Sequence, residues 1–309
     1  MATNARTLPL RRAGAFMRVP GPEARTASKI GIVGLPFDTG AHPLRIGARL
    51  GPTSIREQSL LLRPYNPPEF DFDPLATLEV SDWGDVDVVP GQIDDAFAKI
   101  EQVTGAVIDS GAFPLTMGGD GAVTLPQLRA TAQRHAGLVV VHIDSHTDSN
   151  PEPKTGHDTG TTFTRAAEEK LVDPEHSLHA GIRGTFRMPG ILANAARLGY
   201  EVVRMAQIES MGIAGLAAHI HAKVGVRPVY VCWDMDVFDP SCAPGVCAPS
   251  WGGFSAREGL ALLRGMHGLN VVAFDVNTIS PPHDVGGMSA LLAANVMLEA
   301  ILLFLQRPR

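Results

Sequence analysis

The stretch LVVVHIDSHTDSN, residues 138–150, decides the fold of this chain. All residues from Leu138 to Ile143 except His142 are apolar, and polar side chains do not alternate with them. A short apolar run of this kind is typical of a parallel strand that helices cover on both faces. The run therefore predicts an α/β protein with a buried, mostly parallel sheet.

Polar side chains follow this strand directly. Asp144, His146 and Asp148 recur at a spacing of two, so in an extended chain they would project to the same side. Two carboxylates and an imidazole suit a hard or borderline divalent cation, and open α/β folds bind ligands at the carboxyl ends of their strands. Asp, Ser, Thr and Asn also build solvated turns, so this segment alone leaves a metal site and a turn equally open.

A second apolar run, VYVCWDMDVFDP at 229–240, also ends in spaced carboxylates, Asp234 and Asp236. Like charges roughly 4 Å apart repel by about 4 kcal/mol per pair at an effective dielectric constant of about 20. Carboxylates that converge from two strand ends therefore need protons or a cation. A metal ion is the simpler explanation, and the two segments together predict a metal centre.

Composition bounds the remaining classes. The chain has 309 residues, of which 45% are hydrophobic and 19% charged, and we expect an arm at 1–28 followed by one globular domain at 29–309. A formal net charge of −6 indicates no basic surface for nucleic acid or anionic lipid. We expect neither partner, no membrane span and a cytoplasmic location. Three cysteines argue against a disulfide framework.

The rest of the chain alternates between strand and helix patterns. The expected strands are 29–36, 75–86, 113–117, 138–143, 176–183, 199–206 and 228–236. The first expected helix begins at the Gly-Pro step at 51–52. Further helices are expected at 93–107, 122–133, 187–198, 212–223 and 287–306. Residues 151–165 form a polar loop over the sheet edge, where loops carry function. The glycine turn at 118–121 lacks a dinucleotide or P-loop fingerprint, which disfavours a phosphate site.

Ordered motifs run through nearly the whole chain: GLPFDTG, GARLGPTSIR, MGGD, HIDSHTDSNP, GIRG, DMDVFDPSCAPG and SPPHD. In this order they resemble the ureohydrolase (arginase and agmatinase) family, especially its members that act on proclavaminate and guanidinobutyrate. The resemblance implies a three-layer α/β/α domain with a mostly parallel sheet of eight strands. It also implies two manganese or nickel ions at the strand ends, whose bridging hydroxide attacks a guanidinium carbon.

The resemblance also implies which side chains bind the ions. The first ion would be held by Asp144, His146, Asp234 and Asp236. The second would be held by Asp144, Asp148, Asp234 and a histidine directly after the Gly-Gly-Asp turn. This chain has Gly121 at that last position, so we expect one ion or none, manganese or nickel.

Three further departures fall where substrate and protons would be handled. The proton-transferring loop histidine of the family aligns with Thr159, and His157 lies two residues away as a catalytic candidate or as an ordinary solvated histidine. Two hydroxyls are lost from the substrate loop, which here contains Cys247, whose thiol offers an alternative metal ligand that we do not favour. Thr278 replaces the glutamate that pairs with the guanidinium.

Two more residues are carried over by the resemblance. Asn150 joins Thr159, Cys247 and Thr278 as a substrate-binding candidate, and Asp239 joins His157 as a catalytic candidate.

Two functions remain open. The chain is a subunit with a degenerate site that acts beside a catalytic paralogue, as in two-component metformin hydrolases, or it is an autonomous agmatinase-like amidinohydrolase with altered proton transfer. Both involve a small guanidino or biguanide compound. The apolar helix at 287–306 must be buried on several sides, and the resemblance adds trimers or hexamers, so we expect a homo- or hetero-oligomer.

Overall fold

The computed structural model describes residues 8–25, 27–39, 44–65, 70–151 and 157–306. Within these residues, nine strands form one sheet in the order β1-β3-β2-β4-β9-β8-β5-β6-β7. Their bounds are β1 Leu10–Arg11, β2 Ile30–Gly34, β3 Val80–Val86, β4 Phe113–Met117, β5 Val139–Ile143, β6 Leu178–Ile182, β7 Glu201–Arg204, β8 Val229–Asp234 and β9 Val271–Asn277. All neighbouring strands are parallel except β1 and β3.

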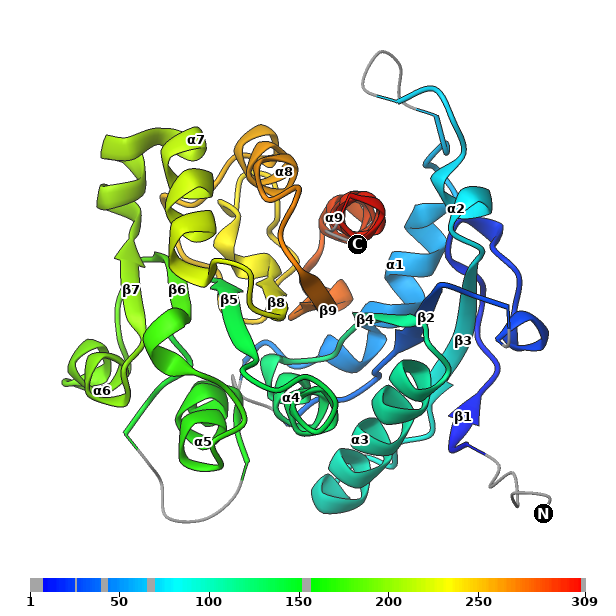
Figure 1. Ribbon diagram of the computed structural model, residues 1–309, viewed down its shortest axis with the longest axis horizontal. Coiled ribbons are helices and arrows are strands. Elements are labelled where there is room, and N and C mark those ends of the chain that lie inside the picture. Colours follow the sequence, from blue (N-terminus) through cyan, green and yellow to red (C-terminus); the bar gives the residue numbers. More distant parts are fainter. Residues whose placement is uncertain (1–7, 26, 40–43, 66–69, 152–156, 307–309) are drawn as a thin grey trace.

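Helices cover both faces of this sheet (Figure 1). Helices α1, α7, α8 and α9 lie over one face, and α3, α4, α5 and α6 lie over the other. The helices are α1 Gly51–Ser59, α2 Pro74–Thr77, α3 Ile93–Asp109, α4 Thr124–Ala132, α5 Thr162–Glu168, α6 Ile191–Leu198, α7 Met205–Val224, α8 Ala256–Gly265 and α9 Met288–Leu305. Each face carries its own cluster of buried apolar side chains. The prediction of a three-layer α/β/α fold is confirmed.

The expected number of eight strands is wrong by one. The ninth strand, β1, lies in the arm at 1–28 and pairs antiparallel with β3. The same arm contains short 3-10 helices at Phe16–Arg18 and Pro22–Ala24, and the side chain of Phe16 is fully buried. The arm therefore adds an edge strand and packs on the domain, while residues 1–7 and 26 lie outside the described residues.

Two other elements differ from expectation. Strand β9 has no counterpart among the expected strands, although it occupies the middle of the sheet. Its carboxyl end holds Asp275 and Asn277, which look like loop residues in the sequence but are buried. Thr124 Oγ1 and Tyr230 Oη donate hydrogen bonds to Asp275 at 2.8 and 2.5 Å, so the fold supplies the partners that make this burial tolerable. The expected strand 75–86 is instead α2 followed by β3.

Helix α9 is long and apolar enough to cross a membrane, and 78% of it is buried inside the protein. It packs against α1 and α8 and over β9 (Figure 1). Its apolar circumference is thus covered by the chain's own sheet and helices, as expected for the core helix of a globular fold.

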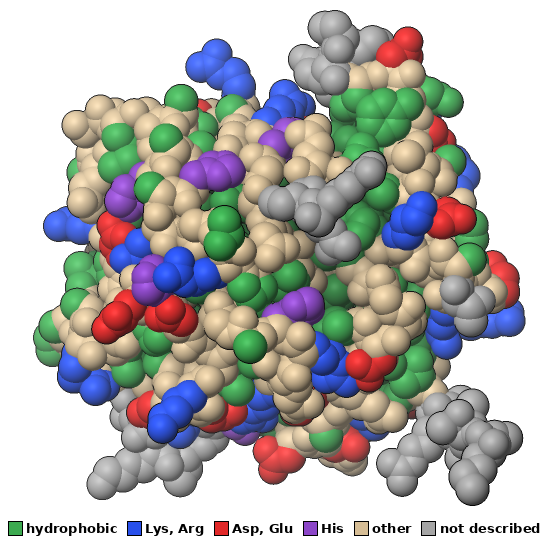
Figure 2. All heavy atoms as spheres, viewed as in Figure 1, with side chains coloured by type: hydrophobic (Ala, Val, Ile, Leu, Met, Phe, Trp, Pro, Cys, Tyr) green, Lys and Arg blue, Asp and Glu red, His purple; other side chains and the backbone are tan. Residues whose placement is uncertain are grey.

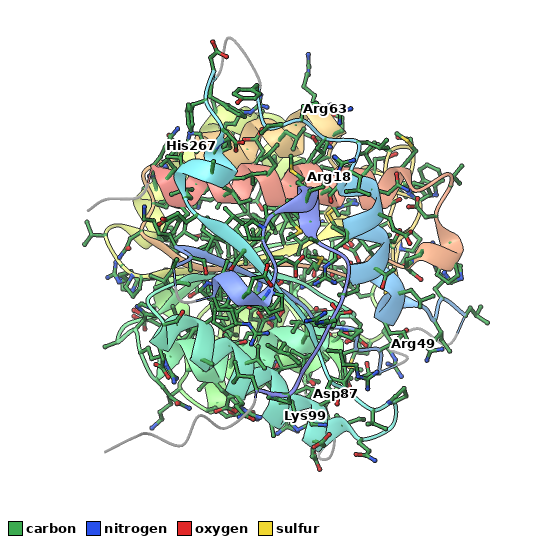
Figure 3. The ribbon with its side chains drawn as sticks, turned by 90° about the vertical axis from the view of Figure 1, so that its right-hand side faces the viewer. Arg18, Arg49, Arg63, Asp87, Lys99 and His267 are labelled. Carbon is green, nitrogen blue, oxygen red and sulfur yellow. The ribbon has the colours of Figure 1, made fainter. Side chains whose placement is uncertain are left out.

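The two arginines of the segment GARLGPTSIR have different surroundings. Arg49 is exposed and lies at the periphery (Figure 3), whereas Arg56 is 3% exposed. The Arg56 guanidinium donates two hydrogen bonds of 2.9 Å to Asp82 and one of 2.5 Å to Asp85.

On the face shown in Figure 2, basic and acidic side chains are interspersed.

Candidate metal centre and substrate cavity

The two carboxylate-bearing segments meet because their strands are neighbours. Strands β5 and β8 pair in parallel, with Ile143 opposite Trp233. The next residues, Asp144 and Asp234, therefore leave the sheet side by side at its carboxyl edge. This is the edge at which open α/β folds bind ligands.

Turns, rather than an extended chain, bring the ligand candidates together. The carboxylate of Asp144 accepts a 2.6 Å hydrogen bond from the backbone N–H of His146. Asp234 likewise accepts one of 2.7 Å from the backbone N–H of Asp236. Asp148 has φ +45°, in the left-handed region. The expected alternation of an extended strand is therefore wrong for 144–148, because β5 ends at Ile143 and each strand-end carboxylate caps the turn that follows it.

Three ligand atoms converge on a common point. His146 Nδ1 lies 3.3 Å from Asp144 Oδ1 and 3.1 Å from Asp236 Oδ2. The ligand atoms of these three residues all lie within 4.8 Å of one another. The carboxylates are buried, while the His146 side chain is 29% exposed towards the cavity described below. This arrangement matches an oxygen-rich, mixed O/N site for a divalent cation.

The electrostatics of the cluster also favour a bound cation. Burial, together with the charge of Asp144, raises the pKa of both Asp148 and Asp234 well above the usual range. The pKa of Asp236 is raised for the same two reasons. Burial opposes ionisation of Asp144 as well, but His142 and His146 beside it hold its pKa well below the usual range. A divalent ion among these groups would remove the cost of ionising them.

Gly121 stands where the resemblance implies a histidine ligand of a second ion, and the structure shows what lies beside it. A Cβ atom on Gly121 would lie 3.3 Å from Asp148 Oδ2, so a side chain there would start towards the carboxylate cluster. The same Cβ atom would lie 2.7 Å from Thr159 Cγ2. The methyl group of Thr159 therefore fills the space beside Gly121. The donor set fits a divalent ion at the first position, whereas the ligands that the resemblance implies for the second are here carboxylates only, with His142 beside Asp144 and Asp148.

A cavity of about 980 Å³ opens over the cluster. Its lining includes His146, Asp148, Asp234 and Asp236. It also includes the predicted residues Asn150, His157, Thr159, Cys247 and Thr278. Asp144 lies beneath this surface and is 1% exposed. The structure thus brings the predicted metal-binding and substrate-binding residues to one place.

Thr278 and Cys247 are occupied by structural contacts. Thr278 has φ +66°, an unusual backbone conformation for a β-branched residue, and its hydroxyl donates a hydrogen bond to Asp234. It therefore contacts a candidate metal ligand and supplies no negative charge. The backbone N–H of Cys247 donates to the Thr278 carbonyl at 3.0 Å. Burial raises the pKa of the Cys247 thiol well above the usual range, which disfavours the thiolate that would bind a metal.

His157 lies in the cavity wall, against helix α3. Its ring stacks on Phe97 with a centroid distance of 4.4 Å, and its Nε2 lies 3.9 Å from Asp94 Oδ1. Burial lowers its pKa, and Arg129 adds to that effect. His157 is therefore a neutral imidazole, with a buried Nδ1, that could accept a proton. The stacking on Phe97, however, turns its ring towards α3. Residues 152–156 of the expected 151–165 loop lie outside the described residues.

Asp239 does not line the cavity. Its carboxylate accepts hydrogen bonds from the backbone N–H groups of Ser241, Gly252 and Gly253 at 2.9, 2.8 and 3.3 Å. These bonds give it a role in holding two loops together. The structure therefore does not bring this catalytic candidate to the metal cluster.

The motif GIRG contributes a residue to which no role was assigned from the sequence. The Arg183 guanidinium donates to the carbonyls of Asp236 and Ser250, each at 2.8 Å, and so joins the metal loop to the cavity wall. Its position directly after β6, at the same sheet edge, was the available signal.

Stability of the metal-free protein is expected to fall as the pH rises from about 4 to about 7. Unfolded carboxyl groups lose their protons near pH 3.9. The folded protein retains protons on Asp148 and Asp234 to higher pH, and burial raises the pKa of Asp120 to about 6. The folded state then binds more protons than the unfolded state across this window, so the free energy of unfolding decreases with pH. The lowered pKa of Asp144 affects the pH dependence only below about pH 3.9, so it does not offset this loss.

Thermal unfolding in chelator at several pH values measures this effect. Asp148→Asn should flatten the pH dependence, and excess Mn²⁺ should raise the melting temperature most at pH 7, where the ligands must otherwise ionise unaided. Metal-free protein whose stability does not depend on these carboxylates would contradict the prediction.

The three-layer fold and the carboxylate–histidine cluster at its strand ends define an arginase-like α/β protein with a candidate divalent-metal centre. Comparison with known proteins gives the same result, because the Arginase family profile matches residues 28–303. The chain belongs to the arginase family.

Several relatives are named for guanidino compounds. Guanidinopropionase of Pseudomonas aeruginosa is 38% identical over 290 residues, which cover 93% of this chain and 90% of that protein. Proclavaminate amidinohydrolase of Streptomyces clavuligerus is 37% identical over 291 residues, covering 93% and 91%. The structure of the latter superposes with a TM-score of 0.90 and 35% identity over 97% of this chain and 99% of that chain.

Proposed function

We propose that this chain is an arginase-family subunit with a degenerate metal centre, which serves the hydrolysis of a guanidino or biguanide compound beside a catalytic paralogue. One observation carries this proposal. The place of a metal-binding side chain at Gly121 is taken by the methyl group of Thr159, a residue that itself cannot titrate near neutral pH. One substitution removes a metal ligand and the other removes the expected proton carrier.

The remaining residues support binding better than turnover. Asp144, His146, Asp234 and Asp236 would hold one ion, which when bound supplies positive charge that polarises and activates water. The Thr278 hydroxyl donates a hydrogen bond to Asp234, and this side chain provides no negative charge to pair with a substrate cation. The chain thus keeps a cavity and one metal position, while the groups for proton transfer and charge pairing are replaced.

A second function, autonomous hydrolysis, has its own supporting observation. The cavity is lined by Arg45 and Arg187 as well as by the metal cluster. A guanidino acid, the class named in guanidinopropionase and guanidinobutyrase, would offer its carboxylate to such cations. In this version His157 or water would carry the proton.

Urea release by the purified chain, alone and after co-expression with an arginase-family paralogue from the same host, tests the two functions. We expect no turnover of guanidino acids or biguanides by the chain alone and turnover by the mixture that exceeds that of the paralogue alone. Efficient turnover by the isolated chain would establish the autonomous alternative instead.

Assembly gives a separate test of the proposed partnership. Trp251 is 75% exposed and directly follows Ser250, which lines the cavity. An exposed indole next to a residue of the cavity wall suits a subunit contact. We expect light scattering to show an oligomer with the paralogue, and Trp251→Ser should weaken this oligomer. A chain that is a monodisperse monomer in solution, and that recovers no paralogue in a pull-down from its host, would contradict the assembly.

A further inference from the structure

A series of buried polar side chains in mutual contact leads from the metal cluster into the sheet. His142 on β5 lies opposite His179 on β6 in the strand register, and both side chains are buried to 1% exposure or less. His142 Nε2 lies 2.8 Å from Asp144 Oδ2, and its Nδ1 lies 2.9 Å from His179 Nδ1. His142 therefore contacts the metal-ligand candidate on one side and a second histidine on the other.

This series of contacts continues back to the loop that carries Asp148. His179 Nε2 lies 3.1 Å from Ser149 Oγ, and the Ser149 hydroxyl donates a 2.9 Å hydrogen bond to the Thr147 carbonyl. Thr147 and Ser149 are the two neighbours of Asp148. The side-chain contacts thus close a ring between the start and the end of the 144–149 segment.

Aromatic packing fixes the two imidazoles in this ring. Phe163 lies 4.3 Å from the His142 ring and 5.1 Å from the His179 ring, between centroids. Tyr200 packs on His179 at 4.7 Å, while its own hydroxyl donates to the Phe163 carbonyl. Neither histidine lines the cavity, so neither is placed to touch a substrate.

We propose that His142 and His179 are positioning residues for the metal centre, because they hold the Asp144 carboxylate and, through Ser149, the turn that presents Asp148. A carboxylate rotates about its terminal bond, and a fixed contact to one oxygen orients the other. Here Asp144 Oδ2 faces His142, which leaves Oδ1 directed towards His146. This inference rests on the proposed metal centre.

The test is the dissociation constant for Mn²⁺, measured by calorimetric titration of the full-length chain. His179→Leu removes the contacts of the His179 imidazole with His142 and Ser149. It should weaken Mn²⁺ binding about 10–100-fold, as expected for the loss of a group that orients a ligand. His179→Gln keeps polar atoms and should recover part of the affinity. Tyr200→Phe, which alters packing next to His179 without touching the ring of contacts, is the matched control and should bind Mn²⁺ like the wild type.

A second measurement separates positioning from simple stabilisation. A purely structural role would lower the melting temperature equally with and without Mn²⁺, whereas a positioning role reduces the rise that Mn²⁺ produces. If His179→Leu does not fold, Ser149→Ala removes a single hydroxyl and should still weaken Mn²⁺ binding several-fold. Folded variants with wild-type affinity would overturn this inference alone, and a wild-type chain that binds no Mn²⁺ would overturn the metal centre as well.

Discussion

The double variant Gly121→His/Thr159→His is expected to raise the number of divalent ions held per chain from one to two. Residue 121 faces Asp148, so an imidazole there would add a nitrogen ligand on the cavity side of the second position. Gly121→His alone should gain less, because Thr159 Cγ2 would lie 2.7 Å from the new Cβ atom and must move. Metal analysis after dialysis against limiting Mn²⁺ gives the count.

Turnover should return only when the substrate's counter-charge is restored too. Proton transfer by a positioned side chain contributes about 10²–10⁴-fold to a rate, and pairing of the substrate cation is a separate contribution. We therefore expect urea release from the triple variant that adds Thr278→Glu and little from the double variant. Gly121→Ala is the control, since it fills space without adding a ligand. Two ions in the wild-type chain, or one in the double variant, would contradict the prediction.

Arg56→Met is expected to lower the free energy of unfolding by about 3–5 kcal/mol, the typical cost of leaving one partner of a buried ion pair alone. Asp82 is 2% exposed and would lose two hydrogen bonds of 2.9 Å. The same carboxylate accepts the backbone N–H of Phe16 at 3.0 Å, so the N-terminal arm should loosen as well.

Urea denaturation measures this loss, with Arg49→Met as the matched control. Arg49 is exposed, and its replacement should change stability by less than about 0.5 kcal/mol. Adding Asp82→Asn to Arg56→Met should recover part of the loss, because the unpaired charge is then removed. Equal midpoints for Arg56→Met and the wild type would show that the pair is not needed for the fold.

The sequence by itself determined the class of fold and the side chains that are candidates for the cluster. Apolar runs of strand length predicted the buried parallel strands, since a strand covered on both faces has no polar side to display. The carboxylates at the ends of β5 and β8 predicted a common site, because parallel strands end at one edge. The glycine at position 121, where the resemblance implies a histidine, is apparent from the sequence alone.

Only the tertiary structure decided how these groups meet. The place of β9 between β4 and β8 depends on pairing between strands far apart in sequence, which no local pattern specifies. The direction of Asp239 depends on loops 241–253 that supply N–H groups to its carboxylate. Thr159 beside Gly121 and His142 beside His179 are likewise contacts across the fold. Local sequence limits which groups are available, and long-range packing selects their partners.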